Sequence, residues 1–240
     1  MLGGEPDVAV YASGLGPDNP EQLAAQKLQE GHRAFKLKIG FGAERDRRNL
    51  AALRDCVGTL PLMLDANQAW DLPQALAASS ALAEFAPLWL EEPLAADRPW
   101  PEWQGLARAS QFRLAAGENL RGLDAFDAAL EAAALGVIQP DLGKWGGFSG
   151  CLEVGRRARA RGVMFCPHWL GAGIGLAATL HLKAALGGPG YAEVDANPNP
   201  LREIGVVPQL KVVAGRIVLG EIPGLGVVPN LAAIEPYRVQ

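Results

Sequence analysis

The sequence predicts an α/β protein whose strands close into a (β/α) barrel of seven strand–helix units and a final strand. Short apolar runs alternate with helical patterns along the chain, which is typical of βαβ units in a parallel sheet. The runs are apolar on both sides, as expected for strands that helices cover. A polar residue ends each of eight runs at intervals of 23 to 27 residues, which matches one strand–helix unit. Eight such repeats favour a barrel over an open sheet.

The expected elements follow one another in regular order. The predicted strands cover residues 8–13, 35–40, 61–65, 88–91, 113–116, 137–141, 163–168 and 191–195. The predicted helices cover residues 20–28, 43–57, 72–85, 123–134, 149–161 and 175–186. Gly31 ends the first helix and Pro93 interrupts the fourth strand, because both residue types break regular structure. No helix is predicted between the fourth and fifth strands.

The composition argues against several classes of protein. The chain has 240 residues, 49% of them hydrophobic, which suffices for a large core in one barrel-sized domain. Its net charge is −4 without a basic patch, and no apolar run reaches the roughly 20 residues that cross a bilayer. The first seven residues lack the blocks of a signal peptide, and the three cysteines lack metal-type spacing. We therefore expect a cytoplasmic protein that binds neither nucleic acid nor a membrane.

Eight polar residues end the eight predicted strands. They are Ser13, Lys38, Asp65, Glu91, Glu118, Asp141, His168 and Glu193. In a barrel, all strand ends meet at one face, where active sites are built. The alternative is that some of these acids only cap the helices that follow them. The regular placement of all eight favours one ring of functional side chains.

Three consecutive strands end in carboxylates. Asp65, Glu91 and Glu118 would repel one another strongly if they lay side by side, so they need a cation. Oxygen ligands without a nearby cysteine favour Mg²⁺, with Mn²⁺ as a possible substitute. The sequence therefore predicts a divalent metal site at this face of the barrel.

Candidate acid and base residues flank these carboxylates. Lys36 and Lys38 lie two residues apart on one strand, so their ammonium groups share one face, and at a barrel mouth each makes it easier for the other to lose a proton. On the other side, Asp141 lies beside His168 and would orient its imidazole. Glu193 completes the ring and can donate a hydrogen bond when protonated. This arrangement suits removal of a proton α to a carboxylate.

Seven short motifs surround these residues. They are Lys36-Leu37-Lys38, Asp65-Ala66-Asn67, Glu91-Glu92-Pro93, Gly117-Glu118-Asn119, Pro140-Asp141 with Gly146-Gly147, Pro167-His168, and Glu193-Val194-Asp195. Together they resemble the enolase superfamily, in its mandelate racemase subgroup, from about Val8 to Pro200. The muconate-lactonising subgroup instead has a second lysine on the sixth strand, where this chain has Asp141. Lys144 lies three residues later in a loop and receives no role.

The resemblance implies a fold, a cofactor and a role for each residue. The fold is a (β/α) barrel of the enolase-superfamily type, and the chemistry uses a Lys or His base with Mg²⁺. The implied metal ligands are Asp65, Glu91 and Glu118. The implied catalytic residues are Lys38 as one base, His168 with Asp141 as the opposite acid or base, and Lys36 with Glu193 at the substrate carboxylate. The expected substrate contacts are Lys36, Asn67, Asn119, Glu193 and Asp195.

Two reactions fit this set of residues. In a dehydration of an acid sugar, Lys38 would take the α-proton and His168 would protonate the departing β-hydroxyl, giving a 2-keto-3-deoxy acid. A racemase or epimerase of 2-hydroxy acids would use the same two residues in opposite senses. The ring alone does not separate the two, and the frequency of dehydratases among similar sequences favours dehydration.

The pattern changes after Asp195. Residues 1–200 are expected to form the barrel, and residues 201–240 to form a C-terminal remnant of the α+β capping domain that members of the family carry. Residues 210–219 read as a hairpin. The N-terminal part of the cap is expected to be absent, which leaves open a truncated barrel that only binds metal. The exposed hairpin favours a homo-oligomer.

Overall fold

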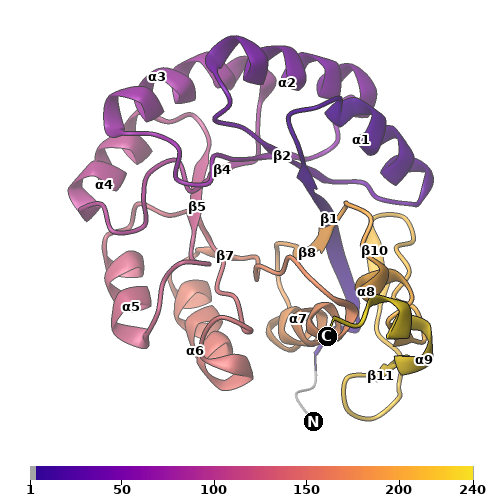
Figure 1. Cartoon of the computed structure of the whole chain (residues 1–240). Coiled ribbons are helices and arrows are strands. Elements are labelled where there is room, and N and C mark those ends of the chain that lie inside the picture. Colours follow the sequence, from indigo (N-terminus) through magenta and orange to yellow (C-terminus); the bar gives the residue numbers. More distant parts are fainter. Residues whose placement is uncertain (1–3, 240) are drawn as a thin grey trace.

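The computed structural model describes residues 4–239 and shows a ring of parallel strands surrounded by helices (Figure 1). The strands are β1 (Asp7–Leu15), β2 (Phe35–Lys38), β3 (Leu62–Asp65), β4 (Trp89–Glu91), β5 (Arg113–Ala116), β6 (Val137–Ile138), β7 (Met164–Phe165), β8 (Ala192–Asp195), β9 (Val206–Val207), β10 (Arg216–Val218) and β11 (Val228–Pro229). The helices are α1 (Pro20–Gln29), α2 (Ala43–Val57), α3 (Leu72–Leu82), η1 (Ala83–Phe85), α4 (Trp100–Ala109), α5 (Leu123–Glu131), α6 (Gly147–Ala160), α7 (Gly173–Leu186), α8 (Pro200–Glu203), α9 (Leu231–Ile234) and η2 (Glu235–Tyr237).

The strand order confirms the predicted barrel. Parallel ladders run from β1 through β7 in sequence order, and β8 pairs with β1 from the other side. Within residues 4–239 no ladder joins β7 to β8. Isolated hydrogen bonds connect these two strands instead, such as the one that the Tyr191 amide donates to the Cys166 sulfur, at 3.4 Å. All eight strands therefore point the same way and present their carboxyl ends at one face.

The two sides of each strand have different partners, because successive side chains point in opposite directions. On β2, Phe35 and Leu37 pack into the core between the strands and the helices. Lys36, between them, points into the ring and reaches carboxylates on β4 and β8. The apolar positions thus attach the helices, while the intervening positions build the interior of the barrel.

An apolar layer fills the interior below the charged residues. It contains Tyr11, Met63, Trp89, Val137 and Cys166, all fully buried. The Tyr11 and Trp89 rings meet edge to face, with centroids 5.6 Å apart, an arrangement that aromatic pairs favour. This layer fills the barrel beneath the charged residues, so the interior is a packed core.

The helix α4 is one feature that the sequence prediction missed. Its first turn contains Trp100 and Pro101, and the proline-rich stretch before it reads as a loop. Proline is well tolerated in the first turn of a helix, because the missing N–H has no partner there in any case. Trp103 and Leu106 bury the inner face of α4 and complete the strand–helix unit between β4 and β5.

The tail differs from the predicted hairpin. Only one bridge, between Val213 and Arg216, remains of it, and β10 instead pairs antiparallel with the first residues of β1, from Asp7 to Ala9. These residues extend beyond the pairings of β1 with β2 and β8, so β10 provides the partner that they would otherwise lack. Ile217 is buried against the same end of the barrel.

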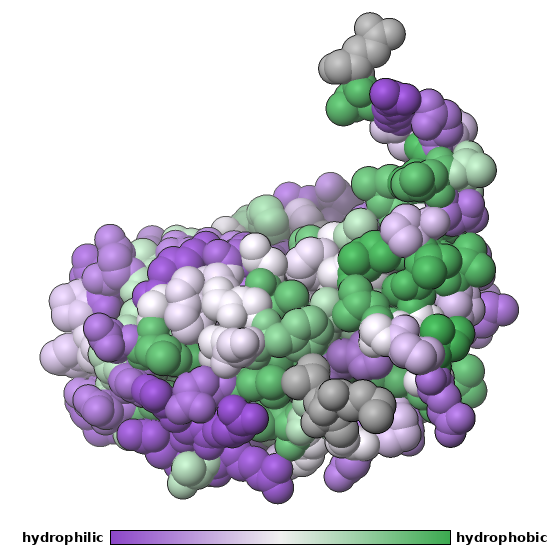
Figure 2. All heavy atoms as spheres, turned by 90° about the horizontal axis from the view of Figure 1, so that it is seen from below, coloured by the Kyte–Doolittle hydropathy of each residue, from purple (hydrophilic) through white to green (hydrophobic). Residues whose placement is uncertain are grey.

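The last residues project from the body of the barrel and carry hydrophobic side chains on their surface (Figure 2). The exposed large hydrophobic residues of this segment are Ile222, Val228, Leu231, Tyr237 and Val239. The assignment of residues 201–240 to a separate capping layer stays a prediction. Among the helices that the structure describes, none combines the length and the apolar character required to span a membrane.

Candidate active site

The carboxyl ends of the strands bring the predicted residues to one face of the barrel. In the ladder between β2 and β3, Lys38 lies beside Asp65, and in the next ladder Asp65 lies beside Glu91. Across the ring, His168 follows β7 and Glu193 lies on β8. The residues predicted from spacing therefore share one end of the barrel, as the barrel geometry requires.

Lys36 is the centre of a buried ionic cluster. Its Nζ lies 2.6 Å from Oε1 of Glu91, 2.8 Å from Oε1 of Glu193 and 3.2 Å from Oδ2 of Asp65. All four side chains are only 1% exposed. Burial lowers the pKa of Lys36, but the surrounding carboxylates outweigh it and hold that pKa well above its usual range. Lys36 is therefore a fixed cation beneath the mouth of the barrel.

Glu91 is held from two sides. Its Oε1 faces Lys36, and its Oε2 accepts hydrogen bonds from Gln139 Nε2 at 2.6 Å and Trp89 Nε1 at 3.3 Å. Burial raises the pKa of Glu91, and the charges of Asp65 and Glu193 raise it further against the opposing effect of Lys36. The cluster has more carboxylates than cations, so a further positive charge would stabilise it.

Lys38 occupies a more accessible position than Lys36. Its Nζ donates to Asp65 Oδ2 at 2.6 Å and to Asn67 Oδ1 at 2.7 Å, and its side chain is 21% exposed. The two lysines point the same way from β2, but only Lys38 reaches the open mouth. Asn67, a predicted substrate contact, lies beside the candidate base.

His168 contacts carboxylates through both ring nitrogens. Nδ1 lies 2.7 Å from Asp141 Oδ2, and Nε2 lies 2.8 Å from Glu118 Oε2. Burial lowers the pKa of His168, but Glu193, Asp141 and Glu118 outweigh this effect and raise it to about 10. Asp141 thus orients the imidazole and favours its protonated form, as predicted for this pair.

Glu193 acts as an acceptor. Its Oε1 accepts from Ser13 Oγ at 2.5 Å, and its Oε2 accepts from the Trp169 amide at 3.0 Å. Burial raises the pKa of Glu193, but Lys36 and His168, with the Ser13 hydrogen bond, lower it below its usual range. The hydrogen-bond donor role implied by the resemblance requires a proton on Glu193, and these neighbours favour its ionised form.

Two further predicted contacts bond neighbouring polar residues of the protein. Asn119 donates to both carboxylate oxygens of Glu92, at 3.0 and 2.9 Å. Asp195 accepts from the backbone and side chain of Asn197, both at 3.0 Å, and lies 3.3 Å from Nη1 of Arg202. Their roles as substrate contacts stay predictions.

Glu92 and Lys144 are polar residues of this face that the spacing did not reveal. Glu92 is 1% exposed and also accepts from Gln68 Nε2 at 3.0 Å. Burial, Glu118 and Asp65 raise its pKa against the hydrogen bonds from Asn119 and Gln68. Lys144 Nζ lies 2.9 Å from Glu118 Oε1. The adjacent acidic pair Glu91-Glu92 was the signal available in the sequence for Glu92.

The donor set has the chemistry of a Mg²⁺ site. Asp65, Glu91 and Glu118 offer only oxygen, and Asp65 raises the pKa of Glu91, which a divalent cation would reverse. Within residues 4–239 these carboxylates do not converge on one point, because ammonium and imidazole groups bind their oxygens. Asp65, Glu91 and Glu118 fit the ion in kind and are the residues that would hold it.

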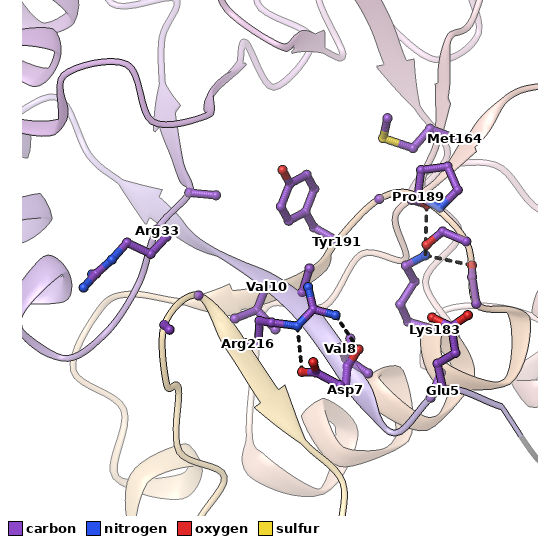
Figure 3. A pocket seen from close by; sticks show the side chains of 18 of the residues that line it. Glu5, Asp7, Val8, Val10, Arg33, Met164, Lys183, Pro189, Tyr191 and Arg216 are labelled. Atoms are coloured by element: carbon purple, nitrogen blue, oxygen red, sulfur yellow. Dashed lines mark hydrogen bonds and ion pairs between the residues drawn. The ribbon is translucent and has the colours of Figure 1, made fainter.

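The opposite end of the barrel also has a cavity, of about 510 Å³ (Figure 3). This volume would admit a small ligand. Two of its cations are already paired, however: Arg216 Nε lies 2.7 Å from Asp7 Oδ1, and Lys183 Nζ donates to the carbonyls of Gly187, Gly188 and Pro189. These contacts stabilise the fold at the amino end of the barrel, and we assign no reaction to this cavity.

A closed parallel barrel with buried ionisable residues at its carboxyl ends defines a (β/α)-barrel protein whose site lies at that face. The chain belongs to the enolase superfamily: residues 20–233 match the family described as enolase C-terminal domain-like. This confirms the resemblance inferred from the motifs.

Individual relatives agree with this assignment. A crystal structure from Bordetella bronchiseptica RB50, described as a mandelate racemase/muconate lactonizing enzyme, is 53% identical, with a TM-score of 0.93 over 98% of this chain. A racemase from Streptomyces coelicolor with bound magnesium is 30% identical, with a TM-score of 0.87 over 98% of this chain. The D-galactarolactone cycloisomerase of Agrobacterium fabrum is 33% identical over 100% of this chain.

The chain spans only part of these relatives. The matches cover 66% of the Bordetella chain, 64% of the Streptomyces chain and 68% of the Agrobacterium protein. Against the human mitochondrial enolase superfamily member 1, 36% identical, the match covers 37% of the relative. The shared part contains the barrel face described above.

Proposed function

We propose that this protein removes a proton α to the carboxylate of a small acid, in a reaction that depends on Mg²⁺, and that the most fitting substrate is an acid sugar. The observation that carries the proposal is the placement of Lys38 and His168 at the ends of β2 and β7, on opposite sides of the ring (Figure 1). A substrate between them would meet one proton acceptor and one proton donor.

Each residue has a defined task in dehydration. Neutral Lys38 Nζ takes the α-proton, and the C–H electron pair moves toward the carboxylate and then forms the new double bond as the β-hydroxyl leaves. His168 donates a proton to the departing oxygen, which leaves as water, and Asp141 keeps the ring oriented. The enol then becomes a 2-keto-3-deoxy acid. Mg²⁺, or Mn²⁺ in its place, supplies positive charge for the developing carboxylate dianion when bound.

Names of relatives support acid sugars as the substrate class. They include L-galactonate dehydratase of Hypocrea jecorina, 32% identical, and arabinonate dehydratase of Saccharolobus solfataricus, 28% identical. A second candidate is an isomerase, a racemase or a cycloisomerase, which the Agrobacterium cycloisomerase and the Streptomyces racemase favour. Both candidates start with the same α-proton step. A barrel that only binds metal would lack it.

One experiment separates these reactions. The protein is incubated with Mg²⁺ and a panel of acid sugars, their lactones and 2-hydroxy acids in D₂O, and NMR records exchange of the α-proton while a carbonyl reagent records 2-keto acids. We expect exchange and a 2-keto acid product, both abolished by EDTA and restored by Mg²⁺.

The variant His168→Asn sharpens the test, and the exposed Lys211→Met serves as its control. His168→Asn should lose the 2-keto acid but keep exchange catalysed by Lys38, because only elimination requires the acid. Exchange with inversion and no 2-keto acid would favour the isomerase. No exchange with any acid in the panel would contradict the proposed function.

A further inference from the structure

Lys144 lies in a rigid turn directly after β6. The turn begins at Asp141, whose backbone carbonyl accepts from the amides of Lys144 at 3.2 Å and Trp145 at 3.0 Å. Its Oδ1 also accepts from the amides of Gly143 at 2.7 Å and Lys144 at 3.0 Å. Such an Asx-type arrangement fixes the backbone through the side chain that begins the turn.

Packing on both sides holds this turn in place. The Trp145 ring lies against Phe126, with centroids 5.3 Å apart. At Gly143, a Cβ would come within 2.7 Å of the Trp169 ring, so the backbone lies directly on that side chain. The loop that contains Lys144 is therefore held by packing and hydrogen bonds, and the backbone of Lys144 has a defined position.

The side chain of Lys144 completes a closed cycle of hydrogen bonds and ion pairs. Its Nζ meets Glu118 Oε1 at 2.9 Å, Glu118 Oε2 meets His168 Nε2 at 2.8 Å, and His168 Nδ1 meets Asp141 Oδ2 at 2.7 Å. The Lys144 amide then returns to Asp141 Oδ1 at 3.0 Å. Lys144 thus touches two of the three carboxylates that contact the imidazole, Asp141 through its backbone and Glu118 through its ammonium group; the third, Glu193, lies 3.5 Å from Nε2.

Lys144 is the nearer of two donors to Glu118 Oε1, at 2.9 Å against 3.4 Å for Asn119 Nδ2. Asp141 fixes Nδ1 of the imidazole. Glu118, which contacts Nε2, has a side chain that is 12% exposed, so its carboxylate requires a second contact to hold its position. The ammonium of Lys144 provides that second contact without touching His168. A carboxylate is planar, so a contact that holds one oxygen of Glu118 also fixes where the other oxygen points. The imidazole is therefore positioned by Asp141 at one nitrogen and by Glu118 at the other.

We propose that Lys144 is a positioning residue of this site, which fixes Asp141 through its amide and Glu118 through its ammonium group and thereby sets where His168 lies. The consequence for catalysis rests on the proposed function, whereas the consequence for the imidazole does not. Residues that orient the groups around a metal or catalytic residue typically contribute about 10–100-fold to activity or metal affinity.

The test uses the full chain labelled with ¹⁵N-histidine, without added metal. The chain has three histidines, so a spectrum of the His168→Asn variant assigns the imidazole signals of His168. Lys144→Met removes the ammonium, Lys144→Arg retains the charge, and Lys211→Met, at an exposed site of the tail, is the matched control. We expect the Nε2–H signal of His168 to shift or broaden in Lys144→Met and to remain near its original position in Lys144→Arg and Lys211→Met.

Turnover and metal binding supply the second readout. With an accepted acid, Lys144→Met should lower kcat roughly 10–100-fold with a smaller change in KM, Lys144→Arg should recover part of it, and calorimetry should show weaker Mg²⁺ binding. Unaltered His168 signals in a folded Lys144→Met protein, or changes that Lys211→Met reproduces, would overturn the proposal. If the wild-type protein turns over no acid, the proposed function fails, and the spectra still decide the role of Lys144.

Discussion

The two ends of the barrel treat charged residues in opposite ways. At the carboxyl end, Lys36 and three carboxylates lie together with side chains only 1% exposed. At the amino end, Arg216 and Asp7 form an ion pair whose side chains are 45% and 51% exposed. The charged groups at both ends lie within hydrogen-bond distance of their partners. Distances alone therefore do not distinguish an active site from contacts that only stabilise the fold.

Burial and charge balance make the distinction. Exposed pairs contribute little because water already solvates both partners, whereas buried charges cost much to desolvate and persist only where each has a partner. The amino end pairs Arg216 with Asp7, whereas the carboxyl end concentrates three carboxylates around Lys36. Such an excess of carboxylates weakens the fold and suits a face that binds a metal ion.

The largest expected effect is on chemistry at the carboxyl end. Lys38→Met removes the candidate base, so we expect exchange of the α-proton to fall by about 10²–10⁴-fold. Deuterium incorporation measured by NMR checks this. Arg216→Met, the equivalent change at the amino end, should leave the exchange rate unchanged. Wild-type exchange in Lys38→Met would show that another group removes the proton.

The next effect is on stability at the same end. Lys36→Met leaves Asp65, Glu91 and Glu193 buried without their shared cation, which should lower the free energy of unfolding by about 3–5 kcal/mol. Urea denaturation at pH 7 measures it. Adding Glu91→Met to Lys36→Met should recover part of the loss, because it removes one of the buried carboxyl groups that lost their partner. A loss below about 1 kcal/mol in Lys36→Met would mean that these carboxylates take up protons readily.

A buried histidine at the amino end should make the free energy of unfolding depend on pH. His32, just before β2, is 4% exposed, and burial, Lys27, Arg202 and Arg33 lower its pKa to about 4 against the opposing charge of Glu30. The unfolded chain binds a proton below pH about 6.5, while the folded protein resists it. Stability should therefore fall between pH 6.5 and 4, by up to about 3 kcal/mol.

The variant His32→Gln isolates this contribution. Urea unfolding across pH 4 to 7 should show a flatter profile in His32→Gln than in the wild-type protein, because the unfolded chain no longer gains this proton. Equal slopes in the two proteins would assign the acid sensitivity to other groups, and the buried carboxylates of the carboxyl end would be the next to test.

The smallest effect concerns the exposed pair. Arg216→Ala should lower the free energy of unfolding by about 0.2–1 kcal/mol, and less at high salt, because ions screen exposed charges. Urea titrations at low and high NaCl concentrations measure the difference. A loss above 2 kcal/mol that salt does not change would show that the two ends differ less than their exposure indicates.

The sequence predicted the parts of the site that follow from periodicity. One polar residue per strand end, spaced by one strand–helix unit, located Lys38, Asp65 and Glu193 at one face, because every parallel strand ends there. The barrel followed from the same repeat. The motif resemblance that named the family, which residues 20–233 confirm, uses these same positions.

The residues that spacing missed depend on local backbone direction. Glu92 turns into the site because its φ is +40°, a left-handed conformation that no strand period predicts. Lys144 reaches Glu118 only because the turn after β6 folds back over Asp141. The sequence did not predict α4 because prolines occupy the beginning of this helix, where they read as a loop. Each of these features depends on the path of a turn, which apolar periodicity does not specify.

The pairing of β1 constrains the order in which the barrel can fold. β1 joins β8 through Val10 and Ala192, and it joins β10 through Asp7 and Val218, so both of these partners come from the opposite end of the chain. Contacts between residues so far apart in sequence slow folding, and during synthesis they form only after most of the chain has emerged. We expect amides of β2 to β4 to gain protection from hydrogen exchange before those of β1, so that the first strand made is among the last secured.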